Sequence, residues 1–167
     1  MNKITEFLRE NNAIESVYDD ISLERARVAW DYLISEPELT IHVILKTHKL
    51  LMLLSPLLPD QKGYFRTVPV YIGGHEAMDW KEIPQAVNHW CEAIKLDDEG
   101  ITDDMAFHVR YEQIHPFVDG NGRTGRMFWN WLRLKRGKEL KIIHEGKEQM
   151  EYYKLFNPPI NGKREVK

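Results

Sequence analysis

The sequence predicts a mainly α-helical domain with one small β-hairpin. Apolar residues recur at three- and four-residue spacing through most of the chain, which is typical of helices that bury one face. Apolar residues alternate at Val68, Val70 and Ile72, where Pro69 restricts the segment to an edge strand or a hairpin arm. At 167 residues the chain is long enough to bury a core, and we expect residues 1–167 to form a single domain.

Three amphipathic helices are expected in the first third of the chain. The first is short and ends at Asn11-Asn12. Ser22 is a candidate N-cap for the second helix, which the Glu36-Pro37 step ends. Thr40 is a candidate N-cap for the third. Because apolar residues leave the third helix little polar surface, we expect it to be central and buried.

A loop is expected over residues 56–63, followed by the hairpin over residues 64–76. An exposed strand edge of this kind can pair with an incoming peptide segment. The equally weighted alternative is an ordinary edge hairpin without a binding role.

Two further helices are expected before residue 116. Pro84 suits the first turn of one, and residues 97–100 form the turn that follows it. Thr102 is a candidate N-cap for the next helix, which Pro116 ends. Its expected inward residues are Met105, Ala106, Val109 and Ile114.

The last part of the chain is expected to contain a helix over residues 123–136, a short strand over residues 139–143 and a helix over residues 148–156. Gly137 is the expected stop of the first of these helices. Residues 158–167 are polar and are expected to form a flexible tail. The residues expected to be buried in the 123–136 helix are Met127, Phe128, Trp131 and Leu132.

The most informative stretch is residues 115–126, His-Pro-Phe-Val-Asp-Gly-Asn-Gly-Arg-Thr-Gly-Arg. His115 can take a proton near neutral pH, and the Asp119 carboxylate can hold a hard divalent cation. Gly-Asn-Gly at residues 120–122 favours a backbone whose N–H groups converge on an anion, at the start of a helix. Arg123 and Arg126 offer forked donors to phosphate oxygens. Together these residue types predict chemistry on a phosphate group.

Other interpretations of this stretch fit less well. Its glycines match a dinucleotide-binding pattern, with Glu145 twenty residues beyond Gly125, but no strand leads into them and no βαβ series follows. A Walker A motif is excluded because no Gly-Lys-Ser/Thr is present, and no zinc-ligand spacing occurs. The remaining histidines are expected to be ordinary structural or surface residues: His42, His48, His75, His89, His108 and His144.

Composition narrows the partners and the compartment. A net charge of −3 gives no reason to expect nucleic-acid binding. The apolar stretch over residues 50–58 is too short to span a bilayer, and the start of the chain lacks the apolar run of a signal peptide. The single cysteine, Cys91, fits a reducing compartment. We therefore expect a cytoplasmic protein without a nucleic-acid or membrane partner.

Residues 115–126 resemble the signature of the Fic family, His-x-Phe-x-Asp/Glu-Gly-Asn-Gly-Arg-x-x-Arg, at every specified position. Looser similarity runs from about Asn11 to Tyr153, and residues 63–73 resemble the family's flap hairpin. The resemblance implies a Fic-type helical bundle that transfers AMP from ATP to a Ser, Thr or Tyr hydroxyl of a target protein.

The resemblance also implies roles for individual residues. His115 would be the general base, and Asp119 would hold Mg²⁺. The hairpin would hold the target segment and cover the nucleotide, and Phe117 is expected to be a core anchor. The expected ATP-binding residues are Val70, Tyr71, Ile72, Gly73, Gly120, Asn121, Gly122, Arg123, Thr124, Gly125, Arg126, Tyr152 and Tyr153.

Residues 1–20 contain a candidate inhibitory segment. Asn11 to Ser16 resembles the family's inhibitory motif Ser/Thr-x-x-x-Glu-Gly/Asn, in which the glutamate pairs with the second arginine of the signature. Here that pair would be Glu15 with Arg126. Asn11 and Ser16 depart from the motif, and the alternative is a helix-end glutamate in solvent.

Three functional hypotheses follow. AMP transfer is favoured, because Doc-like phosphotransferases usually carry Lys where Gly122 stands. The alternatives are a different transfer by the same scaffold, either Doc-like phosphorylation or transfer of another nucleotide, and a non-catalytic nucleotide-binding module. Removal of AMP, a homo-oligomer and an antitoxin partner stay open.

Overall fold

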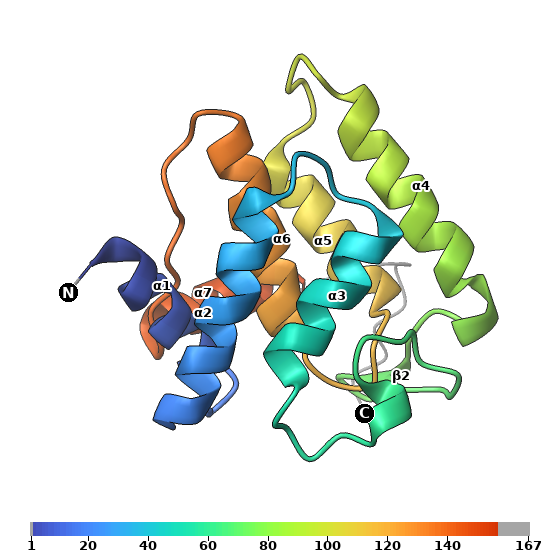
Figure 1. The fold of residues 1–167 in the computed structure, drawn as a ribbon. Helices are drawn as coiled ribbons and strands as arrows, with labels where there is room; N and C mark the ends of the chain where they lie inside the picture. The colour runs from blue at the N-terminus through green and yellow to red at the C-terminus, as the bar shows by residue number, and fades with distance from the viewer. Residues whose placement is uncertain (1, 157–167) are drawn as a thin grey trace.

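A computed structural model describes residues 2–156, and within them the chain is mainly α-helical with one small hairpin, as predicted (Figure 1). The expected tail, residues 158–167, lies outside the described residues. None of the described helices is long and apolar enough to cross a membrane. The elements in chain order are α1 (Lys3–Ala13), α2 (Asp20–Ser35), α3 (Ile41–Met52), η1 (Pro59–Gln61), β1 (Tyr71–Ile72), β2 (His75–Glu76), η2 (Trp80–Glu82), α4 (Ile83–Leu96), α5 (Asp104–Ile114), α6 (Asn121–Lys135) and α7 (Lys147–Lys154).

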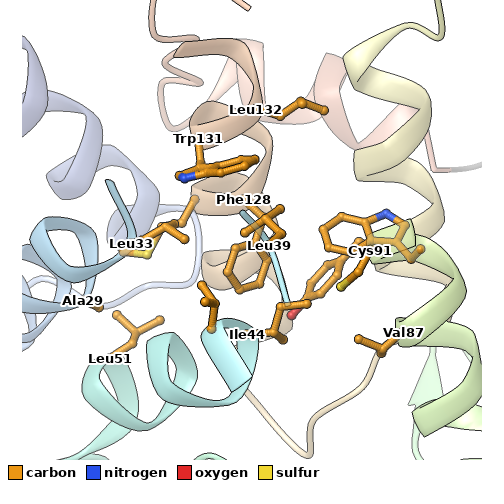
Figure 2. Close-up of a cluster of buried hydrophobic side chains, with 14 of the residues drawn as sticks. Ala29, Leu33, Leu39, Ile44, Leu51, Val87, Cys91, Phe128, Trp131 and Leu132 are labelled. Atoms are coloured by element: carbon orange, nitrogen blue, oxygen red, sulfur yellow. The ribbon is translucent and has the colours of Figure 1, made fainter. Parts of the chain in front are cut away.

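The central helix is α6, which packs against α1, α2, α3 and α5. Figure 2 shows Phe128 of α6 among Leu33 of α2, Ile44 of α3 and Cys91 of α4. The four residues predicted to be buried on this helix are buried. The prediction that the third helix is the central one was wrong, because α3 keeps an exposed side at His42, Lys46 and Lys49 and lies on the outside of α6 (Figure 1).

Aspartates cap two helices for which the sequence predicted hydroxyl caps. Thr40 caps α3 as predicted, since its Oγ1 accepts a hydrogen bond of 3.2 Å from the Val43 amide. Asp19 rather than Ser22 caps α2, and Asp103 rather than Thr102 caps α5. An aspartate side chain accepts the same amide bond, so neighbouring polar residues compete for the position. The helix α1 runs through Asn11 and Asn12, because both are buried in the fold.

The predicted hairpin is present but short. Tyr71 pairs with Glu76 and Ile72 with His75 in an antiparallel register. Gly73 and Gly74 form the connection with φ values of +55° and +84°, which a two-residue hairpin turn of this hand requires. All four strand residues are exposed. The hairpin therefore stands out from the helical body at the lower right of Figure 1.

Two other sequence predictions were wrong. Residues 139–143 form no strand; the Asn130 side chain instead satisfies the Lys141 backbone, accepting 2.7 Å from its N–H and donating 3.1 Å to its carbonyl. On α5, Ala106 is exposed and Met105 and Val109 are only partly buried. The face that α5 buries carries polar groups, namely Asp104, His108 and Tyr111 beside Phe107 and Ile114, so hydrophobicity alone indicated the wrong side.

Candidate active site

His115 ends α5 in a left-handed conformation, with φ 49° and ψ 63°. Its N–H donates to the Tyr111 carbonyl at 3.0 Å, which completes the last helical turn. Its carbonyl accepts 2.8 Å from Nε of the buried Arg66. A residue other than glycine in this conformation is strained, and such strain is often found at functional sites. The backbone of His115 is thus fixed at the end of the helix by contacts from two parts of the chain.

The loop after His115 is pinned by two side chains. Asn121 accepts 2.8 Å from the Phe117 amide and donates 2.8 Å to the Phe117 carbonyl. His48 of α3 stacks on the buried Phe117 ring at a centroid distance of 3.7 Å, and its Nε2 lies 2.9 Å from the Asp119 carbonyl oxygen. Phe117 is the core anchor that the sequence predicted. The Asn121 side-chain amide therefore uses its oxygen and its nitrogen to hold the loop. In this conformation neither atom is available to a phosphate.

The start of α6 faces a small pocket. Gly120 precedes the helix with φ +83°, so that the backbone turns directly into Asn121 and Gly122. The first amides of a helix have no acceptor within it and carry its partial positive charge. The pocket has a volume of about 110 Å³. Its lining is Glu15, His115, Val118, Asp119, Gly120, Asn121 and Gly122.

Arg126 is buried and held by the last turn of α1 and by Glu15, which follows that helix. Its Nη2 donates 2.8 Å to the Glu15 carboxylate, so the structure contains the ion pair that the sequence suggested. Its Nε also donates 2.6 Å to Asn11 Oδ1, and Nη2 donates 3.1 Å to the Asn11 carbonyl. The Asn11 amide then donates 3.1 Å to the Arg123 carbonyl. Asn11, which departs from the family's inhibitory motif, is thus a second partner of the arginine.

Arg123, Thr124 and Gly125 lie differently from the pocket residues. The Arg123 guanidinium is buried beside Met52, at 3.2 Å from its sulfur. Thr124 Oγ1 lies 2.8 Å from the Tyr111 hydroxyl, and a Cβ added at Gly125 would collide with side chains of α5. Thr124 and Gly125 therefore pack α6 against α5, and neither lines the pocket.

The hairpin and the tyrosine pair border the site without lining the pocket. Arg66 donates 3.0 Å to the Val68 carbonyl and 2.6 Å to the Met78 carbonyl, which lie on either side of the hairpin. Because it also donates to the His115 carbonyl, it connects the hairpin segment that contains Val70 to Gly73 with the site. Tyr152 is buried, with its hydroxyl 2.7 Å from His108 Nε2. Tyr153 is partly exposed and reaches the Ile14 carbonyl at 3.5 Å. Both tyrosines lie under the segment that carries Glu15.

The His115 imidazole is neutral at neutral pH because it is largely buried. Burial lowers the pKa of His115 to about 4, so at neutral pH it is uncharged and can accept a proton. Asp119 is exposed, and its Oδ1 accepts 2.7 Å from the Gly120 amide. No group of three His, Cys, Asp or Glu side chains that could hold a metal ion occurs in residues 2–156. A Mg²⁺ bound through Asp119 would need phosphate oxygens as further ligands, which is how Mg²⁺ commonly binds.

Sequence patterns gave no site role to three residues that shape this site, His48, Arg66 and Glu112, and showed Asn11 only as a departure from the inhibitory motif. Each acts through a contact between distant segments or through burial. His48 lies 71 positions from Asp119 and Arg66 lies 49 positions from His115, so no local spacing connects them. The one available local signal was Glu112, three residues before His115 on the same helix.

Comparisons with known proteins agree with this site. A model of the Fic/DOC family matches residues 38–132. The chain is 32% identical over 134 residues to "Protein adenylyltransferase Fic" of Drosophila grimshawi and 33% identical over 134 residues to that of Drosophila virilis. These alignments cover 78% of this chain and 27% of each relative, so the chain spans much less than the relatives' full length.

Solved structures share the fold. A Fic-domain-containing signaling protein from Bacteroides thetaiotaomicron superposes with a TM-score of 0.77 at 20% identity, over 91% of this chain and 69% of that chain. Fic-1 from C. elegans superposes with a TM-score of 0.70 at 20% identity, over 93% of this chain and 55% of that chain.

Proposed function

Because the chain belongs to the Fic/DOC family, we propose that it is a protein adenylyltransferase that moves AMP from ATP to a hydroxyl group of a target protein. The observation that carries the proposal is one pocket bordered by a neutral imidazole, a carboxylate and the N-terminus of α6. The adenylyltransferase relatives support the same activity.

His115 would act as the general base. Its ring takes the proton of a Ser, Thr or Tyr hydroxyl while that oxygen attacks the α-phosphorus of ATP. The new bond joins the hydroxyl oxygen to phosphorus, and the bond to the β-phosphate oxygen breaks, so pyrophosphate leaves. The left-handed conformation and the Arg66 contact fix the backbone from which the ring projects toward the pocket.

The phosphate groups would lie along the start of α6. The backbone amides of Gly120 to Gly122 offer donors, and Arg123 and Arg126 offer positive charge for the β- and γ-phosphates. Asp119 would hold Mg²⁺, which would offset charge on the phosphates. The exposed edge of β1 would pair with the target segment.

The described conformation would be autoinhibited. Glu15 lines the pocket, and its carboxylate forms an ion pair with Arg126, a residue that is only 2% exposed. The remaining volume of about 110 Å³ is well below the roughly 300 Å³ or more of typical small-molecule sites. Productive ATP binding therefore requires Glu15 to move away from Arg126.

The test compares the intact chain with Glu15→Gly, Glu15→Gly/His115→Ala and the control Glu99→Gly, which removes an exposed glutamate from a turn outside the site. Each is incubated with ATP, Mg²⁺ and a cell lysate, and modified peptides are identified by mass spectrometry. We expect AMP adducts that increase in Glu15→Gly, stay unchanged in Glu99→Gly and disappear in the double variant. Phosphate adducts, or no adduct with Glu15→Gly, would refute AMP transfer. Adducts that do not increase in Glu15→Gly would refute autoinhibition.

A further inference from the structure

Among the buried polar atoms that lack a hydrogen-bond partner within the described residues, two belong to neighbouring side chains beside the pocket. They are Nδ1 of His115 and Oε1 of Glu112. The two side chains project from the last turn of α5, and the second carboxylate oxygen of Glu112 lies 4.0 Å from His115 Nδ1. Buried polar atoms are nearly always paired, so an unpaired couple next to a candidate base calls for an explanation.

The position of Glu112 is built into the packing of α5 against α6. A side chain at Gly125 would collide with the Glu112 carboxylate, so the absence of a Cβ there creates the space that the carboxylate fills. Burial raises the pKa of Glu112 to about 7, although the positive charge of Arg126 opposes the rise and Glu15 adds to it. A buried carboxylate of this kind costs folding stability, which a purely structural residue would avoid.

His115 in turn needs support as a base. Burial and the nearby charge of Arg66 together bring its pKa down to about 4, while the Glu112 backbone carbonyl and the charges of Glu15 and Asp119 oppose the fall. General bases act best when their pKa lies near the working pH. If Glu15 leaves on ATP binding, as the proposed function requires, one of the groups that support the protonated ring is lost.

We propose that Glu112 is the positioning residue of His115, keeping a proton on Nδ1 and stabilising the imidazolium that forms when Nε2 takes the hydroxyl proton. This inference rests on the proposed function, in which His115 is the base. The proton on Nδ1 stays there, the new proton goes to Nε2, and Glu112 remains ionised throughout. The 4.0 Å separation closes by about 1 Å to reach hydrogen-bond length, and such contacts commonly tighten only in the substrate complex.

The surroundings of Glu112 define the expected pH response. The charged or titratable groups that influence it are His115 and Tyr111 on its own helix, Arg126 of α6, Glu15 after α1 and Tyr152 of α7. The ionised carboxylate supports the imidazolium, so transfer should rise with pH as Glu112 loses its proton near pH 7. The same ionisation should lower stability. Since the folded-state pKa is raised from 4.5, the unfolded chain ionises first and stability falls as pH rises from about 4.5 to about 7.

The experiment uses the Glu15→Gly chain as background and adds Glu112→Gln or the charge control Glu99→Gln. AMP transfer is measured as kcat and KM for ATP from pH 5 to 9, and thermal unfolding is measured at pH 8. The tautomer and pKa of His115 are read by NMR of histidine-labelled protein without ATP. Glu112→Gln keeps the shape of the side chain and removes only its charge.

We expect Glu112→Gln to lower kcat at least about tenfold with little change in KM, and to remove the rise in rate near pH 7. We also expect it to lower the pKa of His115 and to raise the melting temperature at pH 8, while Glu99→Gln changes none of these. An unchanged kcat and pH profile would overturn the inference. So would a joint loss of rate and melting temperature, because that result indicates a packing role. If no variant transfers AMP, the proposed function fails, and the NMR titration still decides: an unchanged pKa and tautomer of His115 in Glu112→Gln would overturn the role of Glu112.

Discussion

The Ser16→Gly substitution should strengthen the segment that carries Glu15. Ser16 has φ 58°, its N–H donates 2.8 Å to the Ala13 carbonyl, and the Val17 N–H donates 3.1 Å to the Asn12 carbonyl. These bonds close the end of α1 in the way that a left-handed glycine usually does. A serine in this conformation costs roughly 1–2 kcal/mol that glycine avoids. Glycine loses about 0.4–1 kcal/mol more entropy on folding, so the expected net gain is about 1 kcal/mol.

This gain should also affect transfer. If the gain favours the conformation in which Glu15 contacts Arg126, the population that can bind ATP productively falls about fivefold, since 1 kcal/mol corresponds to that factor. We therefore expect Ser16→Gly to lower basal AMP transfer about fivefold in the intact chain. In the Glu15→Gly background it should leave transfer unchanged, because the contact that it favours is absent.

The assay combines urea unfolding with initial rates of AMP transfer in both backgrounds. Ser16→Ala is the control, because alanine retains the Cβ that causes the strain. A free energy of unfolding that does not increase in Ser16→Gly would show that the left-handed conformation costs no more than the entropy that glycine loses on folding. A basal rate that rises, or one that falls equally in both backgrounds, would refute the link between this residue and Glu15.

Two further predictions concern buried charges that do not line the pocket. Arg66→Lys should lower the free energy of unfolding by at least about 2 kcal/mol in urea, because the single nitrogen of lysine cannot reach the three carbonyls that Nε, Nη1 and Nη2 of arginine contact separately. A loss under about 0.5 kcal/mol would contradict this. Burial raises the pKa of Asp104, but hydrogen bonds from Lys138, Trp129 and Arg133 outweigh it and bring the pKa to about 2. The ionised carboxylate should stabilise the fold above pH 3.8, and this stabilisation should be lost as pH falls toward 2. Asp104→Asn should therefore lower the free energy of unfolding by about 2 kcal/mol at pH 7 and make it depend less on pH in the acid range. An unchanged dependence of the free energy of unfolding on pH in this range would refute the prediction.

The core of the candidate site could be predicted because its chemistry is local. A base, a carboxylate and a helix start lie within eight residues, from His115 to Gly122, and the structure brings them to one pocket. The same spacing could not show which residues of the motif face elsewhere. Since α6 begins at Asn121 and each residue turns about 100° around the axis, Thr124 and Gly125 face α5. Their identity is explained by packing.

The rest of the site depends on contacts between residues far apart in the chain, which periodic patterns in the sequence cannot indicate. Arg66 and His48 reach the motif from other elements, and both would be read in isolation as ordinary polar residues. The same limit explains the error on α5. Its inner face is stabilised by polar pairs, such as His108 with Tyr152, so a search for apolar spacing selects the opposite side.

Gly122 shows why control of the proposed activity would lie in residues 11–16 and not in the pocket. A side chain at Gly122 would collide with Glu15 Oε1 and approach Arg126 Nη1. Its absence opens the start of α6 to a carboxylate, and the same space would admit a phosphate. A substitution there cannot exclude Glu15 without also obstructing ATP. Within residues 2–156, preference for one anion over the other would therefore depend on residues that hold Glu15 in place, such as Asn11 through Arg126 and Ser16 through its backbone.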